Sequence, residues 1–254
     1  MPSTNKRASR FGSSGTLALK WLLYQGTLHS DHRYLAIKSR LVRLASRLGW
    51  YEHHIIRQLG RVVPRGGTAV DVGANCGVYT ATFLRAVGPT GQVHALEPNP
   101  AYQRMLLTCG AHHPGFHYHS LAAGATERLQ RLHVPRLRIG ALEPALASLV
   151  QLSVAGTDLD VRVVPLDELL ASIERVDVIK IDVEGLELEV LLGSMQLLRR
   201  FRPALIVETL DLEALEQLFR TSGTGYRRTY PDALGLAGTE QALDSTYVFE
   251  WHEE

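Results

Sequence analysis

From residue 68 onward, short apolar runs alternate with longer stretches of helical periodicity. The pattern predicts strands at residues 68–72, 92–96, 115–121, 176–183 and 204–208. It predicts helices at residues 78–87, 101–110, 186–200 and 211–220. Strands and helices that alternate in this way indicate right-handed βαβ units around a mostly parallel sheet. The runs VDVIKI and ALIV are almost wholly apolar, which is typical of strands covered by helices on both faces.

The flanking segments follow other patterns. Residues 1–15 predict a disordered tail, and residues 16–60 predict a helical segment that packs on the remaining domain, residues 61–254. The stretches ERLQRLHV and DVRVVPL predict an additional strand pair, while the fold of residues 126–165 as a whole stays open. Near the end of the chain, GYRRTY and STYVFEWHEE predict an antiparallel hairpin at one edge of the sheet.

A glycine-rich turn, DVGANCG, follows the first predicted strand. Asp71 stands at the strand end, and Gly73 and Gly77 allow the backbone to approach a ligand closely. Ligands of open parallel sheets bind beyond the carboxyl ends of the strands. Glu97 ends the next strand, where an acid typically accepts hydrogen bonds from two ribose hydroxyls. The turn and the acid together predict an adenosine site, whereas the turn alone is also compatible with tight packing.

The spacing of the glycines indicates which adenosine-containing cofactor the turn could bind. The dinucleotide pattern GxGxxG is absent, since the turn has the spacing Gly73-x-x-x-Gly77, and the phosphate-binding pattern GxxxxGK[ST] is absent as well. A glycine turn with an acid and no phosphate-binding group favours S-adenosylmethionine, which has no phosphate. We therefore expect this molecule as the cofactor.

Composition and charge exclude several classes of protein. The chain has 254 residues and is 45% hydrophobic, which excludes a disordered chain. Its 27 Lys and Arg residues nearly balance 26 Asp and Glu residues, which argues against a protein that mainly coats nucleic acid. The two cysteines, Cys76 and Cys109, form no metal-binding spacing and predict a reducing, cytoplasmic location. We expect no transmembrane segment, because no apolar run is long enough to cross a bilayer.

Three motifs, DVGANCGVYT, ALEPNP and VDVIKIDVEGLELEVLLG, resemble the FkbM family of S-adenosylmethionine-dependent methyltransferases. The resemblance extends from about Tyr51 to Glu208, and WYEHH resembles the Tyr-Glu segment that precedes the first strand in that family. It implies an α/β class I methyltransferase fold of Rossmann type, with helices on both faces of a mostly parallel central sheet, an antiparallel C-terminal edge and an N-terminal helical extension. It also implies methyl transfer to oxygen of sugars, polyketides or other secondary metabolites.

Strand-end placement and the resemblance together imply a set of cofactor-binding residues. These are Glu52, Asp71, Gly73, Asn75, Gly77, Glu97, Asn99 and the backbone near Ala122. The segments that set substrate choice are expected in residues 1–45, in residues 126–165 and at the C-terminus, where the resemblance is weakest.

The end of the fourth strand offers candidates for a general base. An alcohol is a poor nucleophile, so methyl transfer to it benefits from a group that takes its proton. Asp182 is the first candidate and Glu184 the second, provided that the chain stays extended between them. Alternatively, Glu184, Glu187 and Glu189 supply negative charge to the first turn of the next helix, and His53 is the base. Carboxylates could also hold a divalent metal, but we expect no metal site.

Two further readings of the function remain open at this point. One is a nucleic-acid or protein methyltransferase on the same fold, although no [DN]PP[YF] motif follows the fourth strand. The other is a scaffold without catalysis, which would not need Glu97 and Asp182. We expect a small-molecule or glycan hydroxyl as the acceptor and no nucleic-acid partner. The histidines of HHPGFHYH are expected to have ordinary structural roles, with His117 and His119 on one face.

Overall fold

The computed structural model describes residues 62–136, 147–149, 154–229 and 246–253, together with four helical residues near position 37. The predicted tail, residues 1–15, and nearly all of the predicted helical segment, residues 16–60, lie outside the described residues.

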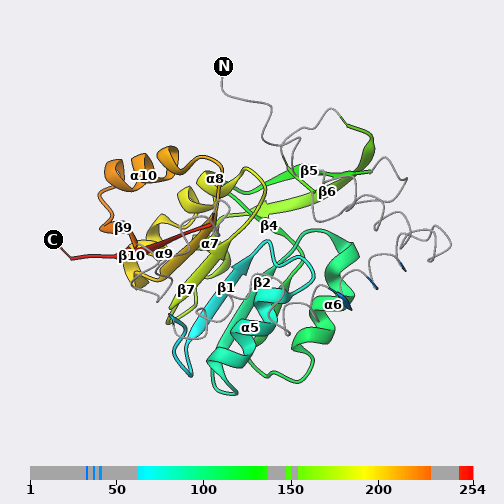
Figure 1. The fold of residues 1–254 in the computed structure, drawn as a ribbon, viewed down its shortest axis with the longest axis horizontal. Helices are drawn as coiled ribbons and strands as arrows, with labels where there is room; N and C mark the ends of the chain where they lie inside the picture. The colour runs from blue at the N-terminus through cyan, green and yellow to red at the C-terminus, as the bar shows by residue number, and fades with distance from the viewer. Residues whose placement is uncertain are drawn as a thin grey trace.

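Within the described residues, seven strands form the central sheet (Figure 1). They are β1 (Thr68–Val72), β2 (Gln92–Leu96), β3 (Phe116–His119), β7 (Val178–Ile181), β8 (Ala204–Glu208), β9 (Tyr226–Thr229) and β10 (Thr246–Trp251). Their order is β3-β2-β1-β7-β8-β10-β9. The first five are parallel, and β10 runs antiparallel to both of its neighbours. This arrangement confirms the predicted class I methyltransferase fold and its antiparallel edge.

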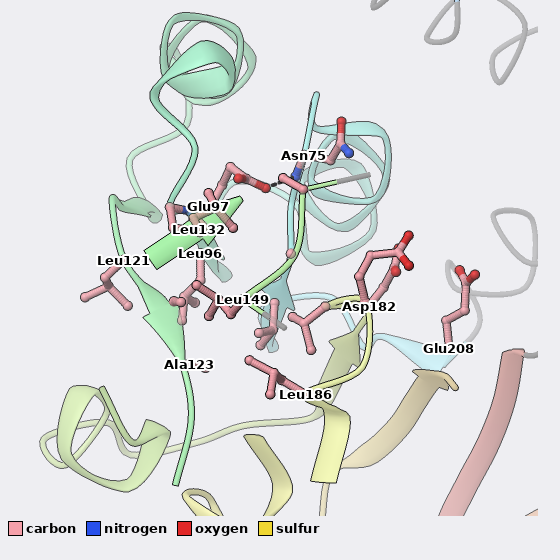
Figure 2. A pocket seen from close by; sticks show the side chains of 17 residues that line it. Asn75, Leu96, Glu97, Leu121, Ala123, Leu132, Leu149, Asp182, Leu186 and Glu208 are labelled. Atoms are coloured by element: carbon pink, nitrogen blue, oxygen red, sulfur yellow. Dashed lines mark hydrogen bonds between the residues drawn. The ribbon is translucent and has the colours of Figure 1, made fainter. Parts of the chain in front are cut away.

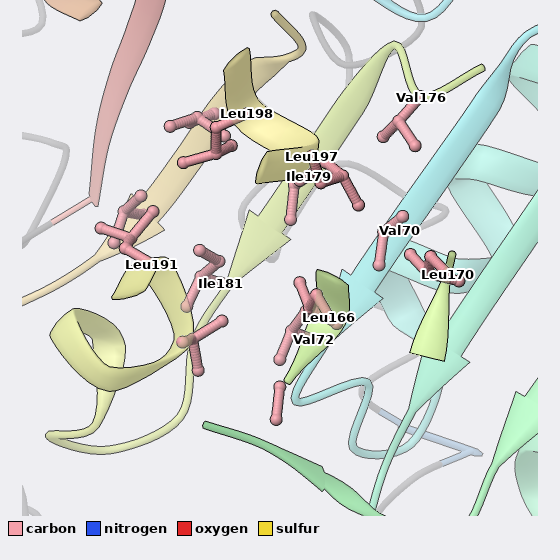
Figure 3. Close-up of a cluster of buried hydrophobic side chains, with 14 of the residues drawn as sticks. Val70, Val72, Leu166, Leu170, Val176, Ile179, Ile181, Leu191, Leu197 and Leu198 are labelled. Carbon is pink, nitrogen blue, oxygen red and sulfur yellow. The ribbon is translucent and has the colours of Figure 1, made fainter. Parts of the chain in front are cut away.

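Helices cover both faces of the sheet. They are α5 (Val78–Val87), α6 (Pro100–Gly110), α7 (Leu166–Leu169), α8 (Glu187–Leu192), α9 (Met195–Phe201) and α10 (Leu212–Thr221). Because side chains alternate along a strand, each strand contributes to two cores. Ala69 and Val178 pack with Phe83 of α5 on one face. Val70 and Ile179 belong to a larger core on the other face, which Figure 3 shows with residues from α7, α8 and α9. None of the described helices has the length and apolar character of a membrane span.

The single helix predicted at residues 186–200 is two helices in the structure. The break lies at Gly193, which packs so closely on another backbone that a Cβ there would lie 2.0 Å from the carbonyl oxygen of Gly124. The carboxylate of Asp167 accepts hydrogen bonds from two amides in the first turn of α9. The prediction of one continuous helix was therefore wrong, because tertiary contacts stop α8 and provide a new start for α9.

A second, smaller sheet follows the central strands β1 to β3 along the chain. It contains β4 (Ala122–Ala123), β5 (Arg128–Pro135) and β6 (Gly156–Val164), in the order β4-β6-β5. The long antiparallel pair of β5 and β6 confirms the predicted additional strands. Arg128 of β5 forms an ion pair with Glu189 of α8, which ties this sheet to the helical layer. Figure 1 shows β5 and β6 beyond the end of the central sheet at which β1 and β7 terminate.

Three histidines stack at the β3 edge of the central sheet. The ring of His94 in β2 lies 4.6 Å from that of His117 and 5.4 Å from that of His119, measured between centroids. Nδ1 of His94 lies 3.1 Å from Nε2 of His119. Burial lowers the pKa of His94 to about 3, and repulsion from His117 and His119 contributes. The cluster confirms that His117 and His119 share a face, and it gives the histidines a role in packing.

We expect His94 to weaken the fold in acid. Its imidazole takes up a proton near pH 6.5 in the unfolded chain but stays neutral in the folded protein down to about pH 3. Its contribution to stability is therefore complete above pH 6.5 and is lost progressively as the pH falls toward about 3. The loss between about pH 6.5 and about pH 5 should be roughly 2 kcal/mol in the free energy of unfolding.

Denaturant unfolding of the wild type and His94→Gln at both pH values measures this effect. The stability difference between the two proteins should shrink in acid, because the variant has no imidazole at position 94 to protonate. A difference that does not change with pH would show that His94 titrates normally in the folded protein.

Candidate functional site

A cavity of about 240 Å³ lies at the carboxyl ends of β1, β2 and β7 (Figure 2). Six of the residues predicted from the sequence line it: Gly73, Asn75, Glu97, Ala122, Asp182 and Glu184. Aliphatic side chains supply much of the remaining surface, among them Leu96, Leu121, Leu132 and Leu149. Figure 2 shows Glu97, Leu96, Leu121 and Leu132 on one side of the cavity and Asp182 and Glu208 on the other. The cavity is therefore apolar near Glu97 and acidic near the end of β7.

The glycine turn is held between two strands. Gly73 has a φ of 77°, and a Cβ at this position would lie 1.9 Å from the carbonyl oxygen of Asp182. The amides of Gly73 and Ala74 both donate to the carbonyl oxygen of Leu96, at 3.0 and 2.9 Å. Gly77 does not line the cavity; its φ of 84° ends the turn and begins α5. Gly73 is thus required by its backbone conformation and by its close contact with the segment after β7.

Glu97 is a buried carboxylate fixed at both oxygens. Oε2 accepts a hydrogen bond of 2.8 Å from the amide of Asn75, and Oε1 accepts one of 2.8 Å from the amide of Asn99. Burial raises the pKa of Glu97 to about 7, although the two amides and the charge of Lys180 oppose this shift. The side chain lines the cavity, so its remaining lone pairs are available to a donor placed there.

Two other predicted cofactor residues lie behind the cavity surface. Asp71 is fully buried; its Oδ2 accepts from the hydroxyl of Thr80 at 2.6 Å. It is not part of the cavity lining, because Val72 occupies the opposite face of β1 and reaches the cavity instead. The expectation of direct contact by Asp71 is thereby corrected. Asn99 caps α6 through a 3.0 Å bond from the amide of Ala101 and orients Glu97, also without lining the cavity. Glu52 lies outside the described residues.

The two candidate bases follow β7 in a turn. The side chain of Asp182 is 31% exposed, and its Oδ2 lies 3.3 Å from Nζ of Lys180. Glu184 has a φ of 52°, so the chain does not stay extended between the two residues as the prediction required. The carbonyl oxygen of Glu184 accepts a bond of 3.1 Å from the hydroxyl of Ser148. Both residues still line the cavity, with Glu184 in the left-handed backbone conformation.

A second cavity of about 230 Å³ adjoins the first. The two cavities share Asp182, Glu184 and Glu208, and the second is also lined by Glu187 and Asp211. Among the described residues that line either cavity, none is Lys or Arg. Among all the residues that the structure describes, no group of three or more His, Cys, Asp or Glu side chains is arranged to hold a metal ion.

Two residues of this region were not predicted to belong to the site. Glu208 is the last residue of β8, and the rule that ligands bind at strand ends would have found it. The other is Lys180 of β7, which the structure buries between Asp71 and Asp182.

The smaller sheet forms one wall of the first cavity. Leu132 of β5 and Ala122 and Ala123 of β4 line it, together with Ala147 and Leu149. Ser148 lies between the last two and exchanges backbone hydrogen bonds of 2.9 and 3.0 Å with His133 of β5. Through its bond to Glu184, this wall contacts the turn that holds the acids.

A family model described as the methyltransferase FkbM domain matches residues 71–227, which is more than half of the chain. The chain belongs to the FkbM methyltransferase family. The matched range contains the glycine turn, Glu97 and both candidate bases.

Several solved structures are similar to this chain. A methyltransferase FkbM from Methylobacillus flagellatus KT is 18% identical with a TM-score of 0.45, and the match covers 73% of this chain and 43% of that protein. Fibrillarin from Aeropyrum pernix with natively bound S-adenosyl-L-methionine is 13% identical with a TM-score of 0.43, covering 75% and 67%. Precorrin-6Y C5,15-methyltransferase from Geobacter metallireducens GS-15 is 13% identical with a TM-score of 0.44, covering 78% and 88%. No protein with a curated functional description matches.

Proposed function

We propose that this member of the FkbM family is an S-adenosylmethionine-dependent methyltransferase that methylates a hydroxyl oxygen of a small neutral acceptor, such as a sugar, a glycoconjugate or a secondary metabolite. The observation that supports this best is the pair of adjoining cavities that share Asp182, Glu184 and Glu208. The first cavity suits the cofactor and the second suits the acceptor. Asp182 borders both, which is the place required of a group that acts on an acceptor next to the methyl donor.

The lining of the first cavity fits S-adenosylmethionine. Glu97 would accept the ribose hydroxyls, while Leu121 and Ala122 offer an apolar surface to the adenine ring. Asp182 and Glu208 at the opposite side would face the positively charged half of the molecule. When bound, S-adenosylmethionine supplies a methyl group already activated by its sulfonium. The protein's own contribution is then mainly to orient the acceptor and accept its proton.

In this proposal Asp182 is the general base. Its carboxylate is partly exposed, lies at the boundary of the two cavities and is held by the ion pair with Lys180. A hydroxyl placed beside it would donate a hydrogen bond to the carboxylate and transfer its proton there, as its oxygen took the methyl group and the bond from that group to the sulfonium sulfur broke. Glu184, on the same turn, is the second candidate.

The charge of the second cavity favours a neutral, hydroxyl-rich acceptor over nucleic acid. Its carboxylates accept hydrogen bonds from hydroxyl groups but repel phosphate. Binding of a nucleic-acid backbone depends on Lys and Arg side chains, and the described lining has neither. This observation supports the glycan or metabolite reading against the alternative of a nucleic-acid methyltransferase.

Methyl incorporation from isotopically labelled S-adenosylmethionine tests the proposal. Neutral glycosides and hydroxylated metabolites should be methylated, whereas the matching sugar phosphates, total RNA and a protein extract should not. Mass spectrometry of the product should place the methyl group on oxygen. Faster incorporation into RNA or protein than into any neutral hydroxyl compound would contradict the proposal.

A further inference from the structure

A buried lysine occupies the middle of the sheet's carboxyl edge. Lys180 of β7 stands directly opposite Asp71 of β1 in the parallel register, and its side chain is only 5% exposed. Its neighbours Ile179 and Ile181 point to the other face, into the large core. A buried ammonium group is costly unless it is paired and hydrogen-bonded, so its contacts must account for its presence.

The ammonium group connects three parts of the site. Nζ donates a hydrogen bond of 2.9 Å to the carbonyl oxygen of Gly73 in the glycine turn. It lies 3.5 Å from Oδ1 of Asp71 in β1 and 3.3 Å from Oδ2 of Asp182 in the turn after β7. The ring centroid of Tyr79 in α5 lies 5.0 Å away. A lysine has three donors, and here they face the cofactor turn, a buried acid and the candidate base.

Lys180 is a fixed cation. Burial acts to lower its pKa, but the charges of Asp182 and Asp71, with that of Glu208, raise the pKa of Lys180 above its ordinary value. The group therefore keeps its proton at neutral pH and does not exchange it during a reaction. Its influence is exerted through position and charge.

We propose that Lys180 is a positioning residue that holds the glycine turn and the Asp182 carboxylate at a fixed separation. If Lys180 served only to neutralise Asp71, it would not need its hydrogen bond to the carbonyl oxygen of Gly73. Asp71 also accepts a hydrogen bond from the hydroxyl of Thr80. The part of this inference that concerns Asp182 rests on the proposed function. The part that concerns the glycine turn is tested by cofactor binding, which needs no acceptor.

The test compares three variants by calorimetric titration with S-adenosylmethionine and by thermal unfolding. Lys180→Met removes the cation and leaves Asp71 buried without it, so it should bind at least about tenfold more weakly and unfold at lower temperature. Lys180→Met combined with Asp71→Asn removes both charges. It should recover most of the stability, while its affinity stays about tenfold below that of the wild type. Asp71→Asn alone keeps Lys180 and should bind within about threefold of the wild type.

The affinities of the three variants decide whether Lys180 positions the glycine turn or only neutralises Asp71. Wild-type affinity in the double variant would overturn the proposal, since Lys180 would then serve only to neutralise Asp71. Equal losses in Asp71→Asn and Lys180→Met would also overturn it, and this comparison holds even where the double variant does not fold. Failure to find a hydroxyl acceptor would leave these binding results unaffected, so the two proposals fail separately.

Discussion

Asp182→Asn is expected to lower kcat by about 10² to 10⁴ while the affinity for S-adenosylmethionine stays within a few fold. Asparagine keeps the shape of the side chain and one acceptor oxygen, but it cannot take a proton from a hydroxyl. Asp182 borders both cavities, whereas the buried carboxylate of Asp71 reaches neither. The loss should therefore appear in the chemical step, measured by single-turnover methyl transfer to the acceptor found by isotope incorporation.

Glu208→Gln is the matched control, because Glu208 also lines both cavities. It removes one acid from the same surface and should reduce kcat by less than about tenfold if Asp182 is the base.

Three results would assign the role of general base, or the role of Asp182, differently. Loss of cofactor affinity together with rate would make Asp182 a binding residue. A normal rate in Asp182→Asn with a collapse in Glu184→Gln or His53→Ala would move the base there. Activity removed by a chelator and restored by magnesium would mean that the carboxylates hold a metal.

Glu97→Ala is expected to weaken S-adenosylmethionine binding about ten- to a hundredfold, because the ribose hydroxyls lose a charged acceptor. Glu97 is held in place by the amides of Asn75 and Asn99, so it is already oriented before the ligand arrives. Calorimetric titration without acceptor measures the effect. Unchanged affinity in the alanine variant would show that Glu97 does not contact the ribose.

The pH dependence of S-adenosylmethionine binding provides a second test of the role of Glu97. Since burial raises the pKa of Glu97 to about 7, a large part of the free protein has this carboxyl protonated near neutral pH. Ribose hydroxyls donate to the ionised form, so binding should release a proton and weaken as the pH falls below about 7, by up to about tenfold per pH unit. Glu97→Gln should bind less tightly but with little pH dependence between about pH 6 and about pH 8. The same slope in both proteins would assign the titration to another group.

The effect of Glu97 on the stability of the free protein has the opposite sign to that of His94. A raised pKa in the folded state contributes stability that is complete below the unfolded value of 4.5 and is lost as the pH rises through about 7. Near neutral pH, ionisation of the buried Glu97 thus lowers the stability of the free protein. A ligand that donates a hydrogen bond to Glu97 in the cavity would offset that loss.

Much of the fold could be predicted from the sequence because its signals are local. The apolar runs of β1, β2 and β8 fall at the predicted residues, and the predicted edge hairpin is present as β9 and β10. The break between α8 and α9 could not be predicted, since it depends on contact between Gly193 and Gly124, which are far apart in sequence. Similarly, the two-residue β4 has no periodicity of its own and forms only where β6 lies beside it.

The residues of the site that lie at the ends of strands could be predicted from the sequence. Glu97 and Asp182 line the cavity as strand-end placement indicated, and Glu208 follows the same rule. Asp71 was misplaced because a strand-end position does not say which face a side chain occupies, although its alternation with Val70 and Val72 could have shown it. The left-handed conformation of Glu184 has no signal of its own in a non-glycine residue.

The position of β10 has a consequence for how the chain is made. β10 lies between β8 and β9, although it follows both along the chain. During synthesis on the ribosome, the outer edge of β8 therefore remains unpaired until residues 246–251 have emerged, and Phe249 is not yet available to pack against Phe219. An open, apolar strand edge invites pairing with other chains. A nascent chain of this protein should thus depend on chaperones until β10 has paired with β8 and has joined β9 to the sheet.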